Sequence, residues 1–230
     1  MSNLEFAKQR LATVKQRIQS ACYAAGREQT EVTLIGASKK KDAKLLQSFR
    51  KAGLNHIGEN YLQEAISKQE SLRNEQFNWH FIGAIQSNKT KLIAQHFDWV
   101  HGVDRVKIAL RLAQQNHKTK PIKTLIQINP DQEQSKAGVT LEKASELADS
   151  ISQIDKLELH GFMMIPMAKE TETEQRKTFA KARKTLETTN QRYGLSLTHL
   201  SMGMSADLEA AIAEGSTMVR IGTDLFGARI

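Results

Sequence analysis

The chain has 230 residues, of which 40% are hydrophobic and 25% are charged, and its formal net charge is +8. These values predict one globular domain over residues 1–230. Cys22 is the only cysteine, which excludes an internal disulfide and suits a reducing compartment. The positive charge favours anionic partners, either small phosphates or nucleic acid, although lysines spread along the whole chain are typical of a solvated surface.

The N-terminus carries charges from the start and has no apolar run that could serve as a signal peptide. No segment approaches the about 20 apolar residues that cross a bilayer. We therefore expect a soluble cytoplasmic protein without a membrane partner. Nothing in the sequence indicates an oligomer, and a monomer is the starting expectation.

The first predicted element is a helix, because Leu4, Ala7, Leu11, Val14 and Ile18 recur at three-four spacing. Gly26 is a plausible stop for it. Cys22 lies beside the apolar stripe and is expected in the core.

From residue 32 onward, strand-like and helix-like segments alternate. The predicted strands are 32–37, 54–57, 79–83, 98–101, 122–128, 157–165, 197–200 and 217–221. Each is followed by a helix or helical turn, an alternation that predicts a parallel sheet. Eight such units favour an α/β fold with a single (β/α)8 TIM barrel and an extra N-terminal helix. A doubly wound open sheet remains the alternative.

Barrel proteins place their functional residues at the C-terminal ends of the strands, and a phosphate often lies between the last two loops. Gly203 and Gly222 allow a close backbone approach to an anion there, and Ser205 and Thr223 offer hydroxyl donors. Arg220 lies on the last strand beside them. The alternative is ordinary: Ser205 caps the next helix and the glycines form turns.

Lys39 directly follows the first predicted strand, within the run Lys39-Lys40-Lys41. A basic run is usually a solvated surface. A lysine at the barrel mouth can instead form a Schiff base if neighbouring cations such as Lys41 and Arg220 lower its pKa. A lysine and a phosphate site at one mouth suggest pyridoxal 5′-phosphate (PLP), which has both an aldehyde and a phosphate.

Other chemistries find little support. The sequence has no zinc-protease, P-loop or nucleophile-elbow motif and no paired cysteines. His80, on a predicted strand, is more typical of a core histidine than of a catalytic one. Trp79 and Trp99 are expected in the core, and no basic patch is interleaved with aromatic residues, so a nucleic-acid partner is not expected.

Several long motifs occur in the order found in a known family. They are residues 37–41 (ASKKK), 58–64 (GENYLQE), 79–89 (WHFIGAIQSNK), 135–138 (SKAG), 201–205 (SMGMS) and 215–223 (GSTMVRIGT). From about Val32 to Arg229 the chain therefore resembles the YggS/PROSC family of pyridoxal phosphate homeostasis proteins, which look like the barrel domain of alanine racemase standing alone.

The resemblance implies roles for several residues. Lys39 matches the lysine that forms the Schiff base with PLP, and Ser205 and the backbone of Gly222 and Thr223 match the phosphate cradle. Arg220 matches the arginine that related racemases place at the pyridine nitrogen. Asn60, His80 and Ser201 fall in family motifs as further cofactor-binding candidates without an assigned contact, and Lys136 matches a lysine near the mouth or at a second binding place.

The sequence departs from the family at two places. Asp42 stands where the family often has a proline, and it can cap the next helix. The chain stops at Ile230, whereas some members end in a lysine-bearing tail. Any role of that tail is in doubt here.

Two functions follow from this resemblance. The first is a PLP-binding protein that takes part in PLP homeostasis as a carrier or buffer, with apo PLP-dependent enzymes as partners and without robust catalytic activity. The second is a PLP-dependent amino-acid racemase or related enzyme.

Racemisation needs a proton-transfer group on both faces of the substrate. The chain ends seven residues after Thr223, without the second domain that supplies a tyrosine in racemases, and Tyr23, Tyr61 and Tyr193 have no matching context. We therefore expect the carrier.

Overall fold

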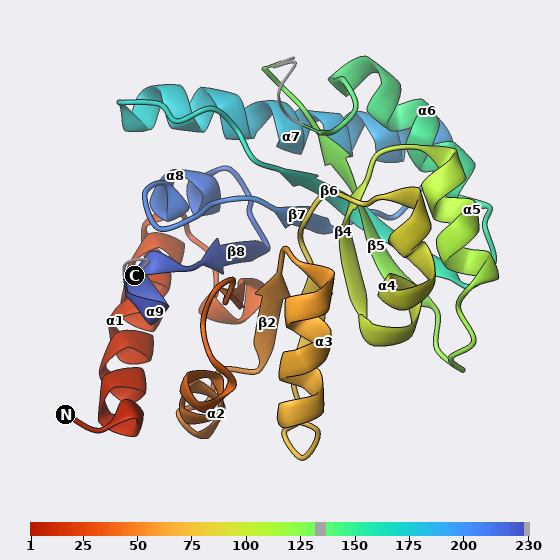
Figure 1. The fold of residues 1–230 in the computed structure, drawn as a ribbon. Helices are drawn as coiled ribbons and strands as arrows, with labels where there is room; N and C mark the ends of the chain where they lie inside the picture. Colours follow the sequence, from red (N-terminus) through yellow and green to blue (C-terminus); the bar gives the residue numbers. More distant parts are fainter. Residues whose placement is uncertain (132–136, 228–230) are drawn as a thin grey trace.

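The computed structural model describes residues 1–131 and 137–227. In this part of the chain eight parallel strands close into a barrel in sequence order, each paired with the next and β8 with β1 (Figure 1). They are β1 (Thr33–Ala37), β2 (His56–Glu59), β3 (Asn78–Phe81), β4 (Trp99–Val103), β5 (Ile122–Ile128), β6 (Leu157–Met164), β7 (His199–Ser201) and β8 (Met218–Ile221). The predicted (β/α)8 barrel is confirmed, and the open sheet is excluded.

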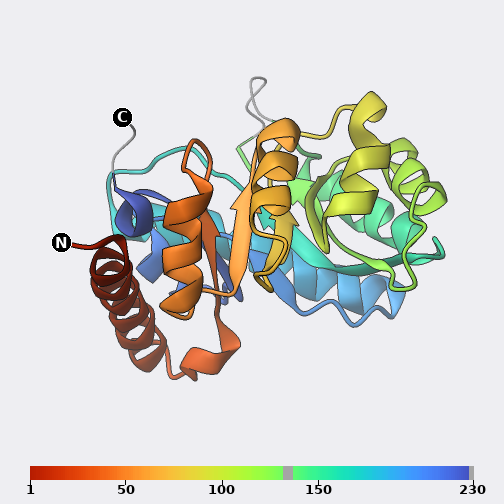
Figure 2. The ribbon, with the colours of Figure 1, turned by 60° about the horizontal axis from the view of Figure 1, so that its bottom comes forward.

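Helices surround the barrel, as the turned view shows (Figure 2). They are α1 (Asn3–Ala24), α2 (Ala43–Lys51), α3 (Leu62–Ser71), α4 (Thr90–His96), α5 (Val106–Gln114), α6 (Leu141–Ser152), α7 (Glu172–Tyr193), α8 (Leu208–Ala213) and α9 (Thr223–Phe226). Short 3₁₀ turns lie at Gln29–Glu31 and Ser87–Lys89.

Helix α1 is the extra N-terminal helix. It begins with a capping box in which the Ser2 hydroxyl accepts from the Glu5 backbone N–H and the Glu5 carboxylate accepts from the Ser2 N–H. The predicted apolar stripe is buried from Ala7 to Ile18, whereas Leu4 at its start is half-buried, and the helix packs against α2, α8 and α9. Gly26 follows the helix in the left-handed conformation, with φ 65°.

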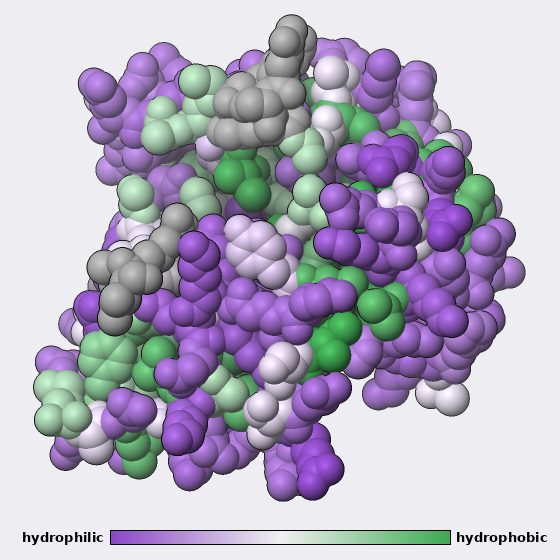
Figure 3. All heavy atoms as spheres, viewed as in Figure 1, coloured by the Kyte–Doolittle hydropathy of each residue, from purple (hydrophilic) through white to green (hydrophobic). Residues whose placement is uncertain are grey.

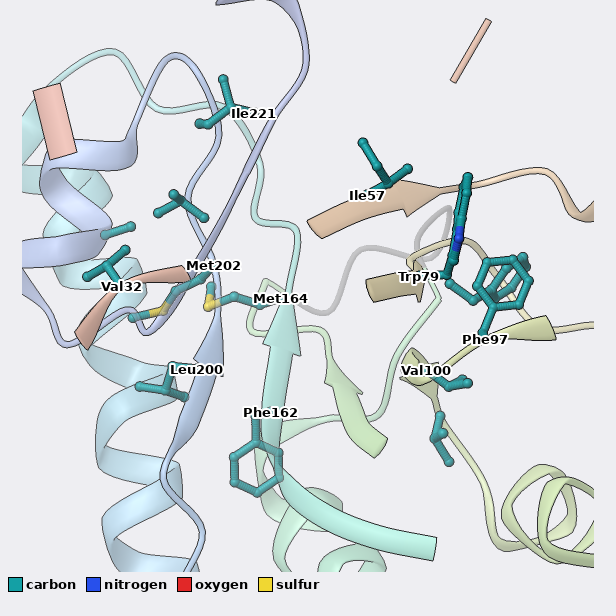
Figure 4. Close-up of a cluster of buried hydrophobic side chains, with 14 of the residues drawn as sticks. Val32, Ile57, Trp79, Phe97, Val100, Phe162, Met164, Leu200, Met202 and Ile221 are labelled. Carbon is teal, nitrogen blue, oxygen red and sulfur yellow. The ribbon is translucent and has the colours of Figure 1, made fainter. Parts of the chain in front are cut away.

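The core has two parts. The larger lies between the strands and the helices and contains residues such as Ile57, Trp79, Phe97 and Phe162 (Figure 4). A smaller apolar cluster comprises Ile35, Trp99, Leu125, Met163 and Met218. It comes from the inward-pointing positions of β1, β4, β5, β6 and β8. Cys22, Trp79 and Trp99 are buried, as expected from the sequence.

Two local predictions have different outcomes. Asp42 caps α2, because its Oδ1 accepts from the Leu45 N–H at 2.7 Å. Ser205 does not cap the next helix: α8 begins at Leu208, and Asp207 precedes it. The Asp207 carboxylate accepts from the Met204 N–H at 2.6 Å and so closes the turn that contains Ser205. Helix α8 therefore begins without a side-chain cap from either Ser205 or Asp207.

The face seen in Figure 3 is mainly hydrophilic, with smaller hydrophobic patches between the hydrophilic residues. None of the helices in the described ranges combines the length and apolar character that a bilayer span needs.

Candidate functional site

Lys39 lies at the corner of a tight turn that follows β1. The Lys41 N–H donates to the Ser38 carbonyl oxygen at 3.0 Å, which closes the turn. Lys40 has φ 61°, a left-handed conformation that costs a non-glycine residue about 1–2 kcal/mol. The Lys40 N–H donates to Glu64 Oε1 at 2.5 Å, which holds this conformation. The half-buried Lys39 side chain therefore starts from a fixed backbone.

A buried ionic network lies behind this turn. The Lys68 ammonium donates to Glu59 Oε1 at 2.6 Å, to Glu64 Oε1 at 2.6 Å and to the Ser38 carbonyl oxygen at 2.7 Å. The Ser38 hydroxyl donates to Glu59 Oε1 at 2.5 Å. Burial raises the pKa of Glu59, and the neighbouring Lys68 charge opposes this shift. The network ties β1, β2 and α3 together directly beneath Lys39.

Strand pairing brings the loops after β8 and β2 to either side of Lys39. Ile35 pairs with Arg220 and Gly36 with Ile221, and a Cβ on Gly222 would lie 3.3 Å from the Ala37 carbonyl oxygen. The β8 loop therefore packs directly against the end of β1. Thr223 begins the short helix α9, whose first N–H groups have no acceptor within the helix.

Asn60 lies on the other side of Lys39. Ala37 pairs with Gly58, and the Ser38 N–H donates to the Gly58 carbonyl oxygen at 3.0 Å. A Cβ on Gly83 would lie 2.4 Å from the Asn60 carbonyl oxygen, so the loop after β3 packs on Asn60 only because residue 83 is a glycine.

The loop after β7 also depends on a glycine. Gly203 has φ 94°, and a Cβ there would lie 2.6 Å from the Cβ of Ala211. Arg17 of α1 fixes this loop from outside. Its guanidinium donates to the Ser205 carbonyl oxygen at 3.0 Å, forms two bonds to the Glu209 carboxylate and pairs with Asp224. One arginine thus holds the loops after both β7 and β8.

Arg220 lies inside the barrel and is 4% exposed. Its Nη1 donates to the carbonyl oxygen and the hydroxyl of Ser201 at 2.6 and 2.7 Å, and its Nη2 donates to the Met164 carbonyl oxygen at 2.8 Å. Burial lowers the pKa of Arg220 to about 10, opposed by Asp207. Arg220 therefore stays charged at neutral pH and acts as a donor only.

The predicted residues fall into two groups. Lys39, Asn60, Ser205, Gly222 and Thr223 follow the C-terminal ends of β1, β2, β7 and β8. The other three, His80, Ser201 and Arg220, lie on strands and are buried inside the barrel, with His80 reaching Ser201 through His101. Lys136 lies outside the described residues.

The sequence prediction did not include Arg17, Glu59, Lys68 or His101. Arg17 and Lys68 act across distant parts of the chain, which no local pattern reveals. Glu59 was placed in a loop because β2 extends two residues beyond its predicted end. His101 had a usable signal: it alternates with Trp99 on β4 and so shares the inward face.

These features define a class: a (β/α)8 barrel with a fixed lysine after its first strand and two close-packed glycine loops after its last two. The residues fit a phosphorylated aldehyde such as PLP, because the loops lack a side chain where an anion would approach and a buried cation lies beneath them.

The chain belongs to the alanine racemase N-terminal domain family, whose model matches residues 10–230. It is similar to the pyridoxal phosphate homeostasis protein of Pseudomonas aeruginosa, with 49% identity over 95% of this chain and 94% of the relative. Identity to the protein of the same name from Escherichia coli K12 is 43%, over 95% of each chain.

Solved structures agree with this assignment. PipY of Synechococcus elongatus PCC7942 with PLP bound shares 34% identity with the chain at a TM-score of 0.84, over 96% of this chain and 100% of PipY. Alanine racemase from Bacillus anthracis has a TM-score of 0.69 at 16% identity, and the match covers 98% of this chain and 56% of the racemase. This second likeness concerns the fold alone.

Proposed function

We propose that this protein binds PLP through Lys39 and takes part in PLP homeostasis as a carrier or buffer. The observation that carries the proposal is the fixed turn at Lys39, which lies between the glycine loop after β8 and the loop after β2. The names of the relatives from P. aeruginosa and E. coli and the bound PLP in PipY support it.

When bound, PLP supplies an aldehyde that links reversibly to an amine. In this proposal the Lys39 amine holds that aldehyde, while the Ser205 hydroxyl and the backbone N–H groups of Gly222 and Thr223 hold the phosphate. With the cofactor bound, Arg220 would be the donor at the ring nitrogen. A donor there would keep that nitrogen unprotonated and make the ring a weaker electron sink, which favours holding the cofactor over catalysis.

The position of the tyrosines supports a carrier over a racemase. Tyr23 lies on α1 and Tyr193 at the end of α7, whereas Tyr61 follows the C-terminal end of β2 and is 54% exposed. An exposed phenol in contact with water is a poor partner for proton transfer on a substrate. We propose a monomeric cytoplasmic protein that donates its PLP to apo enzymes.

Transfer of the cofactor tests this function. The PLP-loaded protein is mixed with an apo PLP-dependent enzyme and with a phosphatase that destroys free PLP. We expect the enzyme to regain activity while an equal amount of free PLP fails to restore it. The same protein is then assayed for racemisation of alanine and serine, with Tyr61→Phe as a matched variant. Racemisation at enzyme-like rates that Tyr61→Phe abolishes, without protected transfer, contradicts the carrier.

A further inference from the structure

A continuous chain of hydrogen-bonded side chains crosses the interior of the barrel. His56 Nδ1 lies 3.0 Å from His80 Nε2, and His80 Nδ1 lies 2.9 Å from His101 Nε2. His101 Nδ1 lies 3.0 Å from the Ser201 hydroxyl, which accepts from Arg220 at 2.7 Å. The chain runs from β2 through β3, β4 and β7 to β8.

This interior is unusual for a barrel, which is commonly filled by branched aliphatic side chains. His80, His101 and Ser201 are fully buried. Trp99 stacks on His80, with ring centroids 5.6 Å apart and planes 11° from parallel. A buried polar group without a partner is costly, so His80 and His101 at this depth require the bonds that they form with each other, with the half-buried His56 and with Ser201.

The protons of the chain can be assigned. When all three rings are neutral, each hydrogen bond between neighbouring side chains of the chain contains one proton. Two arrangements are then consistent: all three rings are protonated on Nε2, or all three are protonated on Nδ1. The Ser201 hydroxyl already accepts from Arg220, and its own buried proton needs an acceptor. His101 Nδ1 is that acceptor when Nε2 carries the ring proton. The arrangement that satisfies Ser201 therefore runs in one direction, from Ser201 through His101 and His80 to His56.

Burial first, and then positive charges on the surrounding strands, disfavour protonation of the rings. The titratable and charged groups that face the chain are Lys123 on β5, His160 on β6, His199 on β7, Arg220 on β8 and Asp207 beyond β7. Burial lowers the pKa of His80 and His101 well below the usual range, with further contributions from neighbouring histidines, Lys123 and Arg220. A neutral His101 keeps an acceptor lone pair for the Ser201 hydroxyl.

We propose that His101 is a positioning residue for the cofactor site: through the Ser201 hydroxyl it fixes the Arg220 guanidinium that meets the PLP ring, with His80 and His56 completing its hydrogen bonds. The inference rests on the proposed function. His80, a predicted cofactor residue, then acts through His101 and Arg220 and does not touch the cofactor.

Two variants of His101 separate positioning from packing. His101→Leu leaves the Ser201 proton without an acceptor, whereas His101→Asn places an amide oxygen near the position of Nδ1. For His101→Leu we expect PLP release about tenfold faster and a shift in the absorption band of the bound cofactor and in its pH dependence. For His101→Asn we expect values within about twofold of the wild type.

His96→Leu is the matched control, because His96 lies on α4 outside the barrel and bonds to Gln69. It should leave the cofactor spectrum unchanged. In the Arg220→Leu background, His101→Leu should add no further effect, because it acts through Arg220. An unchanged spectrum and release rate in folded His101→Leu, or additive effects in the double variant, overturn the proposal.

A measurement without cofactor separates this inference from the proposed function. In the PLP-free protein, nitrogen NMR of the histidine rings should show the Nε2–H tautomer at His101. His101→Leu should move the Arg220 guanidinium resonance, and His96→Leu should not. If the wild type takes up no PLP, the proposed function fails, and these resonances still decide whether His101 positions Arg220. An unmoved Arg220 resonance refutes the positioning role.

Discussion

Lys68 carries its charge into a site where its side chain is only 7% exposed, and it is stabilised there by Glu59 and Glu64. Charges at this depth are stable only when they are paired, so removing one partner leaves the remaining buried charges unpaired. Nothing in the local sequence distinguishes Lys68 from the many surface lysines. Its role depends on Glu59 at the end of β2, and the predicted strand ended two residues before that position.

Lys68→Met should therefore lower the free energy of unfolding by about 3–5 kcal/mol. The measurement is denaturant unfolding, with Lys44→Met, an exposed lysine on α2, as a control that should change by less than about 0.5 kcal/mol. Adding Glu59→Gln should recover part of the lost free energy of unfolding, since it removes a buried carboxylate that no longer has a cationic partner. Equal stabilities for Lys68→Met and Lys44→Met would show that the network does not stabilise the fold.

At the scale of elements, helix α1 packs on the outside of the barrel and contacts the loops at the barrel mouth through Arg17. Arg17 holds the loops after β7 and β8 together through Ser205, Glu209 and Asp224. The apolar stripe of α1 was readable from its spacing, and the alternating strands and helices predicted the barrel. The contacts of Arg17 lie about two hundred residues away in the sequence and could not be read from any pattern.

Arg17→Met should weaken PLP binding by roughly five- to tenfold, because the loops after β7 and β8, which we propose as the phosphate cradle, lose a shared anchor worth about 1 kcal/mol or more. Titration with PLP measures this, and inorganic phosphate as a competitor shows whether the loss lies in the phosphate cradle. Arg10→Met on the same helix is the control, since Arg10 lies over Phe6. Unchanged affinity in Arg17→Met would mean that the loops hold their shape without α1.

At the scale of the whole molecule, the barrel interior is rich in histidine. Burial, then His160 and Lys123, lower the pKa of His199 to about 4, and burial lowers the pKa of His80 and His101 as well. An unfolded histidine titrates near 6.5. Because the folded pKa is lower, the unfolded chain binds more protons below pH 6.5, and stability falls as pH falls.

Between pH 6.5 and about 4, His199 contributes at most about 1.4 kcal/mol per pH unit to the loss of stability, and His80 and His101 contribute in the same direction. His199→Asn should flatten this dependence in urea unfolding at pH 7, 6 and 5. The exposed His117→Asn should leave it unchanged. A wild type equally stable at pH 7 and pH 5 would refute the neutral histidine interior.

The most direct test of PLP attachment to Lys39 is the absorption spectrum of the purified protein with added PLP, for the wild type, Lys39→Ala and Lys40→Ala. Lys40 is the exposed neighbour in the same basic run, and its backbone bond to Glu64 survives the substitution. Attachment of PLP to Lys39 predicts a yellow, lysine-linked band for the wild type and Lys40→Ala that is absent in Lys39→Ala. A band that persists in Lys39→Ala, or a wild type that stays colourless, would contradict it.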